Sequence, residues 1–150
     1  MSPDARFMQH ALRLAQHAQR DGEVPVGAII VMGDRIVGEG WNQPIKTHDP
    51  TAHAEIVALR AASASLATYR LNAAVLYVTL EPCVMCIGAI INARIARVVF
   101  GAWDQKAGAC GSVLDVPRET RLNRRVDVFG GVSGEEASAL LKTFFGERRR

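Results

Sequence analysis

The sequence lacks the features that mark three classes of protein. Its three cysteines among 150 residues are too few, and odd in number, for a disulfide framework. No apolar run approaches the roughly 20 residues that a bilayer span requires, and the longest, residues 24–32, contains a proline and a glycine. The N-terminus carries Asp4, Arg6 and His10 where a signal peptide needs an apolar stretch. We therefore expect a cytoplasmic protein that is neither secreted nor held in a membrane.

Internal repeats, low-complexity tracts and linker-like segments are also absent. A composition of 49% hydrophobic and 22% charged residues is typical of a globular protein and argues against disorder. The length corresponds to about one domain, which is large enough to bury a proper core. We therefore expect a single domain over residues 1–150, with a basic C-terminal tail at about 146–150.

Basic side chains are concentrated in the second part of the chain. Residues 1–93 carry seven basic and eight acidic side chains, whereas residues 94–150 carry eleven basic and seven acidic ones. A local excess of this kind suits a phosphate backbone, but it equally describes a solvated surface with a frayed tail. The clustered arginines are Arg118, Arg121, Arg124, Arg125, Arg148, Arg149 and Arg150.

The hydrophobic pattern predicts helices that alternate with strands. We expect helices over residues 3–20, 50–66, 83–93 and 135–145, and strands over residues 24–32, 35–40, 74–80, 95–100 and 126–129. Gly33-Asp34 would join the first two strands as a hairpin, residues 41–49 would be a polar loop, and residues 101–125 a loop with one helical turn. This order indicates an α/β protein with helices on both faces of its sheet.

Two short segments carry the residue types of a metal site. They are His53-Ala54-Glu55 and Pro82-Cys83-Val84-Met85-Cys86, and each stands at the start of an expected helix. Cys83 and Cys86, three residues apart, face the same side of a helix, and the positive end of the helix dipole favours thiolates. One histidine with two thiolates matches zinc. Three protein ligands leave the fourth tetrahedral position open, which is typical of a catalytic site.

Other interpretations of the two cysteines stay open at this point. A Cys-x-x-Cys pair also occurs in redox proteins and forms half of many structural zinc sites, which need a fourth ligand. The chain offers His10, His17, His48 and Cys110 for that purpose. We expect the first two on the surface of a helix and the third cysteine as an ordinary small thiol. Glu55 favours catalysis, because a carboxylate two residues beyond His53 can take a proton from water at the metal and return it to a leaving group.

His-x-Glu followed by Pro-Cys-x-x-Cys resembles the signature of the zinc nucleobase deaminases. Further matching segments extend over nearly the whole chain: residues 24–28, 41–42, 48–55, 76–86, 97–102, 111–112 and 144–145. With these segments the sequence resembles the bacterial tRNA-specific adenosine deaminases, within the zinc-dependent cytidine/deoxycytidylate deaminase superfamily.

The resemblance implies a three-layer α/β/α cytidine-deaminase-like fold with a mixed five-stranded central sheet, assembled as a homodimer. It implies one zinc ion per chain and hydrolytic deamination of adenosine to inosine at the wobble position of a tRNA anticodon stem-loop, that of an arginine tRNA. His53, Cys83 and Cys86 would bind the zinc, and Glu55 would move protons. The residues that would contact the substrate are Val26, Asn42, Ala54, Asp104, Lys106 and Phe145; among them Asn42 would hold the flipped base and Val26 would line its pocket.

Asp104 has two possible roles. An ionised carboxylate repels phosphates, so its presence beside an RNA site needs a reason. Asp104 either caps a turn of its loop or accepts a hydrogen bond from a substrate 2′-hydroxyl, the group that distinguishes RNA from DNA.

One stretch, residues 116–125, departs from the family pattern. Where a His-Pro and then Leu-Asn-His are expected, residues 118–124 read Arg-Glu-Thr-Arg-Leu-Asn-Arg, which leaves the zinc chemistry untouched and RNA docking open.

Three alternative functions stay open. A zinc deaminase of a free base or nucleoside (cytosine, guanine or related) needs no basic surface, a non-catalytic zinc-dependent RNA-binding module needs no Glu55, and a redox protein needs no His53.

Overall fold

The first helix, α1 (Pro3–Arg20), forms where the sequence pattern places it in the computed structural model, which describes residues 1–148. The Ser2 hydroxyl accepts a hydrogen bond of 3.1 Å from the Ala5 backbone N–H, and Pro3 occupies the first turn, where no helical partner for its nitrogen is needed. One face of the helix is buried. Its buried residues recur every three or four positions: Met8, Ala11, Leu12, Ala15 and Ala18.

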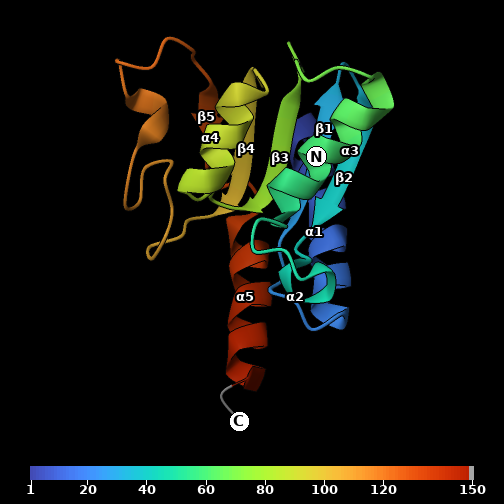
Figure 1. Cartoon of the computed structure of the whole chain (residues 1–150). Coiled ribbons are helices and arrows are strands. Elements are labelled where there is room, and N and C mark those ends of the chain that lie inside the picture. The colour runs from blue at the N-terminus through green and yellow to red at the C-terminus, as the bar shows by residue number, and fades with distance from the viewer. Residues whose placement is uncertain (149–150) are drawn as a thin grey trace.

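Five strands form one mixed sheet (Figure 1). They are β1 (Gly27–Met32), β2 (Arg35–Trp41), β3 (Val75–Leu80), β4 (Arg97–Ala102) and β5 (Asp127–Phe129). The spatial order is β2-β1-β3-β4-β5, with β1 antiparallel to both neighbours and with parallel pairing of β3 to β4 and of β4 to β5. The hairpin at residues 33–34 and the five-stranded sheet are confirmed.

Helices cover both faces of the sheet, so the three-layer α/β/α prediction is also confirmed (Figure 1). Helices α3 (Ala54–Leu66) and α4 (Val84–Asn92) pack on one face, and α1 and α5 (Gly134–Arg148) on the other. Strand β1 shows why its sequence is continuously apolar: Ala28 and Ile30 face the core under α3, while Ile29 and Val31 face the core under α1.

Helix α3 lies unusually close to strand β2, and this contact places the start of the helix. A Cβ atom on Gly40 would come within 2.4 Å of the Ala54 carbonyl oxygen and 2.6 Å of the Ala58 backbone nitrogen. Only glycine permits this approach. The contact sets the position of Ala54, and with it that of His53 and Glu55 on either side.

Two elements near the metal motif differ from the prediction. Residues 41–49 are not wholly loop, because Pro44–Thr47 form the short helix α2. The buried Glu23 carboxylate accepts hydrogen bonds from the backbone N–H groups of Ile45 (3.3 Å) and Lys46 (2.9 Å) and so stabilises the first turn of α2. Helix α3 begins at Ala54 rather than at residue 50, because residues 49–53 form turns.

The C-terminal helix is longer than expected. Helix α5 continues to Arg148, so residues 146–148 of the expected tail are helical. The Arg148 guanidinium donates a hydrogen bond of 2.5 Å to the Gly22 carbonyl and lies 4.7 Å over the Phe144 ring, contacts that anchor the last turn. The rest of that expected tail, Arg149 and Arg150, lies outside the described residues. The helical turn expected within residues 101–125 is a 3₁₀ turn, Val116–Arg118.

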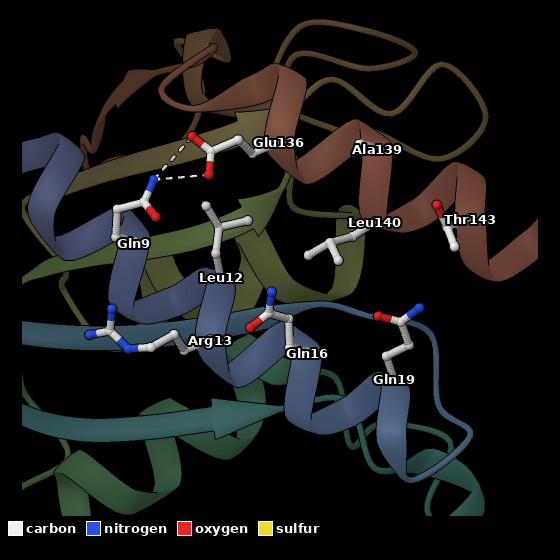
Figure 2. A pocket seen from close by; sticks show the side chains of 9 residues that line it. All are labelled: Gln9, Leu12, Arg13, Gln16, Gln19, Glu136, Ala139, Leu140 and Thr143. Atoms are coloured by element: carbon white, nitrogen blue, oxygen red, sulfur yellow. Dashed lines mark hydrogen bonds between the residues drawn. The ribbon is translucent and has the colours of Figure 1, made fainter.

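A polar groove of about 500 Å³ separates α1 from α5 (Figure 2). The Gln9 amide on α1 donates to both carboxylate oxygens of Glu136 on α5 at 3.1 Å, closing one end of the groove. This groove lies on the α1 face of the sheet, away from α3 and α4, and none of the expected site residues lines it. Within residues 1–148, no helix combines the length and hydropathy that crossing a bilayer requires.

Candidate metal centre and active site

Three side chains meet at the adjacent starts of two helices: His53, and Cys83 and Cys86, which lie 30 and 33 residues further along the chain. His53 is the N-cap residue of α3 and Cys83 that of α4, while Cys86 lies one turn into α4 and is fully buried. The Nδ1 atom of His53 lies 3.6 Å from the Cys83 sulfur and 3.5 Å from the Cys86 sulfur. The three candidate ligand atoms all lie within 4.8 Å of one another.

These distances fit a tetrahedral zinc ion. Zinc binds imidazole nitrogen at about 2.0–2.1 Å and thiolate sulfur at about 2.3 Å, so nitrogen and sulfur on neighbouring corners of the tetrahedron are about 3.6 Å apart. The observed separations of 3.6 and 3.5 Å match that value. His53, Cys83 and Cys86 are the ligand cluster that the described residues form, and such a set of three leaves one corner free.

Contact between the two cysteine sulfurs shifts their pKa values in opposite directions. The hydrogen bond from Cys86 lowers the pKa of Cys83 to about 4, and the neighbouring His53 acts in the same direction. The pKa of Cys86 is raised by its hydrogen bond to the Cys83 sulfur and by its burial. The hydrogen bond between His53 and Cys83 raises the pKa of His53. A thiolate is therefore ready for a soft cation, which would displace the remaining proton.

Glu55 is a buried carboxyl group in the first turn of α3, with 4% of its surface exposed. Burial raises the pKa of Glu55 to about 7, while the charge of His53 lowers it and the charge of Cys83 raises it. A carboxyl group with a pKa near neutrality exchanges protons in both directions, as a general acid–base requires.

Three of the expected substrate residues form a connected support beside the metal ligands. The Asn42 side-chain oxygen accepts a hydrogen bond of 2.8 Å from the Ala54 backbone N–H, and the Asn42 backbone N–H donates to the Val26 carbonyl at 3.1 Å. The first bond fixes the orientation of the Asn42 amide. Its NH₂ group makes no hydrogen bond within the described part of the chain and is available as a donor. Val26 and Ala54 are buried.

Phe145 reaches the same region from the other end of the chain. It lines a cavity of about 240 Å³ together with Asn42, and Phe144 and Arg148 of α5 also line it. Phe145 is 44% exposed and packs edge-on against Phe144, with 5.3 Å between ring centroids. The structure therefore brings Asn42 and Phe145 together, 103 positions apart in the sequence.

Asp104 and Lys106 lie on the loop that follows strand β4. The Asp104 side chain accepts hydrogen bonds from the backbone N–H groups of Lys106 (3.0 Å) and Ala107 (3.2 Å), so it caps a turn of its own loop. The turn-capping role is therefore confirmed. A contact with a 2′-hydroxyl stays a prediction, as does a contact from the exposed Lys106.

None of the alternative fourth ligands reaches the cluster. Within residues 1–148, His10 instead pairs with Glu39, the His17 ring packs at a tilt against Trp41, and Cys110 is buried in the loop after β4. His48 ends helix α2 in a left-handed conformation. A closed, four-ligand structural site is therefore not formed by these side chains.

Sequence reasoning missed two buried carboxylates, Glu23 and Glu81, each 2% exposed. Glu23 holds the backbone of α2. Glu81, directly before Pro82, holds the loop that carries Asp104. The available signal was a carboxylate inside or beside an apolar stretch, because such a group is rarely buried without partners.

Comparisons with known proteins agree with this geometry. A family model of the cytidine and deoxycytidylate deaminase zinc-binding region matches residues 1–102. The tRNA-specific adenosine deaminase of Haemophilus influenzae is 51% identical over 147 residues, which is 97% of this chain and 85% of that protein. A solved structure from work on A-to-I editing by tRNA:A34 deaminases superposes with a TM-score of 0.88 at 40% identity, covering 91% of this chain and 99% of the other.

A guanine deaminase shares the fold at a greater distance. The enzyme of Bacillus subtilis superposes with a TM-score of 0.66 at 34% identity, covering 97% of this chain and 93% of the other. The family match spans both metal-binding segments, and the tRNA-specific relative matches almost the full length at higher identity. The chain is a member of the cytidine and deoxycytidylate deaminase zinc-binding family and, within it, of the tRNA-specific adenosine deaminases.

Proposed function

We propose that this protein converts adenosine to inosine at the wobble position of a tRNA anticodon by zinc-dependent hydrolysis, with release of ammonia. The observation that carries the proposal is the cluster of three ligands, His53, Cys83 and Cys86, next to the buried carboxyl group of Glu55. Three ligands leave the fourth position of a tetrahedral metal site free. Membership of the tRNA-specific adenosine deaminases supports the choice of substrate.

Glu55 is the residue that moves protons in this mechanism. His53, Cys83 and Cys86 would hold the zinc ion, which would supply hydroxide at neutral pH by lowering the pKa of water toward about 7. Glu55 accepts the proton that water loses and passes it to the purine ring nitrogen N1, which makes C6 a better electrophile. The C–O bond forms as hydroxide adds to C6. Glu55 then carries the proton of the new C6 hydroxyl to the amino group, and ammonia leaves as the C–N bond breaks and the C6 carbonyl forms.

The surrounding residues orient the base. The free NH₂ group of Asn42 donates a hydrogen bond to the flipped base, while Val26 and Ala54 form the buried wall behind it. Phe145 offers an aromatic edge at the cavity that it shares with Asn42. Extrusion costs little for an anticodon base, because it is already unpaired.

Asp104 and Lys106 contact the RNA backbone in this proposal. Only one oxygen of Asp104 is used in capping its turn, so the other can accept a hydrogen bond from a 2′-hydroxyl. Lys106 is exposed on the same turn and offers a positive charge to a phosphate. The tRNA is an arginine tRNA, as the family resemblance implies, and the reaction takes place in the cytoplasm.

We also propose that the protein acts as a homodimer. On the metal-binding helix α4 and the loop after β4, four apolar side chains of the described residues are at least half exposed: Val84 (59%), Trp103 (50%), Val113 (55%) and Leu114 (50%). A second copy of the chain would cover such side chains. The molecular mass in solution, measured by light scattering across a dilution series, tests this point.

The proposed activity is tested by incubating the purified protein with a pool of tRNA and sequencing the product. Inosine is read as guanosine, so we expect an A-to-G change at the wobble position of one tRNA, and none with the Glu55→Gln variant. Ammonia release from adenosine, cytosine and guanine is measured in parallel. Turnover of a free base without any change in tRNA would instead assign the protein to the small-molecule deaminases, with which it shares its fold.

RNA binding is expected to weaken steeply with salt, and the arginines to contribute unequally. Arg118 lies 3.9 Å from Asp115, and Arg121 is paired with Glu119, so part of their charge is neutralised. Arg124 and Arg125 form no ion pair among the described residues. Each phosphate that a variant no longer neutralises lowers the slope of log K against log salt by about 0.7 on single-stranded RNA. We expect this decrease for Arg125→Ala and a smaller one for Arg121→Ala.

Arg35→Ala is the matched control for the salt series. Arg35 is exposed at the β1–β2 hairpin, at the far end of a seven-residue strand from the segment that carries Asn42. That strand is roughly 20 Å long. Binding of an anticodon stem-loop, measured by fluorescence anisotropy at several salt concentrations, gives the slopes. Equal slopes for all three variants and the unaltered protein would exclude the region around Arg125 from the RNA contact.

A further inference from the structure

The buried carboxylate of Glu81 is used in neither the metal site nor the proton transfers described above. It is 2% exposed and follows directly on strand β3, two residues before the metal ligand Cys83. Burying an ionised carboxylate is costly unless hydrogen bonds replace its water shell. The position therefore calls for partners, and a single loop supplies them.

Four hydrogen bonds reach Glu81, all from the loop after β4. Its Oε1 atom accepts from the Asp104 backbone N–H at 2.9 Å and from the Ser112 hydroxyl. Its Oε2 atom accepts from the backbone N–H groups of Cys110 (2.9 Å) and Ser112 (3.1 Å). The carboxylate thus accepts hydrogen bonds from both ends of residues 104–112, and each of its oxygens has two donors.

The backbone joins the same two segments. The Ala109 N–H donates to the Pro82 carbonyl at 2.9 Å, next to Cys83. Gly108 packs against the carboxylate so closely that a Cβ atom there would lie 2.3–2.4 Å from the carboxyl atoms of Glu81. The loop therefore encloses the carboxylate, and its position depends on that group. Loops of this kind are otherwise mobile, because few buried contacts hold them.

We propose that Glu81 is a positioning residue that holds the loop of residues 103–112, and with it Asp104 and Lys106, in register with the zinc ligand Cys83. This inference rests on the proposed function, in which the loop contacts the RNA. Glu81 touches neither the metal cluster nor the site of proton transfer. Glu81 instead sets the fraction of molecules in which the loop has its RNA-binding conformation.

Glu81→Gln is the first test. The amide replaces one acceptor oxygen by an NH₂ group, which cannot accept hydrogen bonds from the backbone N–H groups of the loop. If the loop is in place in only a tenth of the molecules, the KM for an anticodon stem-loop rises about tenfold. The expected result is this rise in KM, with kcat changed less than about threefold and with one zinc per chain retained. Glu135→Gln, at an exposed position of α5, controls for the charge change.

Gly108→Ala tests the same contact between the loop and the Glu81 carboxylate, with Glu81 itself unchanged. The added methyl group displaces the carboxylate from its donors, and the backbone angle at Gly108 is one that alanine can adopt. We expect the same rise in KM. Gly88→Ala, in helix α4 where a Cβ atom meets nothing within 4 Å, is the matched control.

Amide hydrogen exchange gives a readout that does not depend on activity. In the unaltered protein the N–H groups of Asp104, Cys110 and Ser112 are expected to be protected, and in Glu81→Gln and Gly108→Ala to exchange at least tenfold faster. Unchanged exchange, an unchanged KM, or loss of zinc and kcat together would overturn the proposal. Should Glu81→Gln fail to fold, Gly108→Ala and Ser112→Ala decide it.

Failure of the proposed function is a separate result. In that case the unaltered protein itself does not deaminate the stem-loop. The exchange rates of the three amides then still show whether Glu81 holds the loop, and zinc retention shows that the effect is confined to it.

Discussion

Replacing Glu55 by Gln is expected to abolish deamination while leaving the fold, the zinc content and RNA binding intact. A general acid–base contributes typically about 10²–10⁴-fold to a rate. Glu55 serves more than one proton transfer in the proposed mechanism, so the loss in kcat should reach the upper end of that range. Single-turnover conversion of an anticodon stem-loop, followed by sequencing or ammonia release, measures it.

The fold of this variant is expected to be at least as stable as that of the unaltered protein. Burial raises the pKa of Glu55 to about 7, so the fold disfavours its charged form. The neutral amide has nearly the same shape and carries no charge to bury. Thermal unfolding and stem-loop affinity serve as controls. A kcat close to that of the unaltered protein would remove Glu55 from the mechanism.

Loss of any one metal ligand is expected to remove the zinc ion. The purified protein should contain about one zinc per chain, since three ligands are supplied by the protein. Cys86→Ala and His53→Ala each leave two ligands, and the Nδ1 to sulfur distances of 3.5–3.6 Å show that each ligand occupies its own corner of the site. Zinc measured by mass spectrometry should fall below about a tenth of an equivalent, because binding is lost with the geometry.

Cys110→Ala is the control for the zinc experiment. Cys110 is a buried cysteine outside the ligand cluster, so its loss removes a thiol of similar burial without touching the site. One zinc per chain should remain in this variant. Full zinc retention in both Cys86→Ala and His53→Ala would refute the assignment of the metal site.

Much of the site was predictable from the sequence, because its parts are local. His53 and Glu55 are two positions apart and Cys83 and Cys86 three, so each pair is fixed by one helix start, whatever surrounds it. The helix and strand order followed from the spacing of apolar residues, and α1 shows this along its whole length. The boundaries of α3 and α5 were less exact, since they depend on contacts with distant segments.

What the sequence by itself determined was the set of chemical groups: three side chains placed to bind a metal ion, a carboxyl group beside them, and the alternation of elements that builds a layered sheet. Only the tertiary structure decided how the site is assembled. Two contacts depend on the order of strands in the sheet. Asn42 and Phe145 line one cavity, and Glu81 accepts hydrogen bonds from a loop 23–31 residues further along the chain. The physical reason is that a side chain that accepts hydrogen bonds from distant backbone N–H groups leaves no periodic pattern in the sequence. Every residue except proline offers the same donor, so the partners are chosen by the fold.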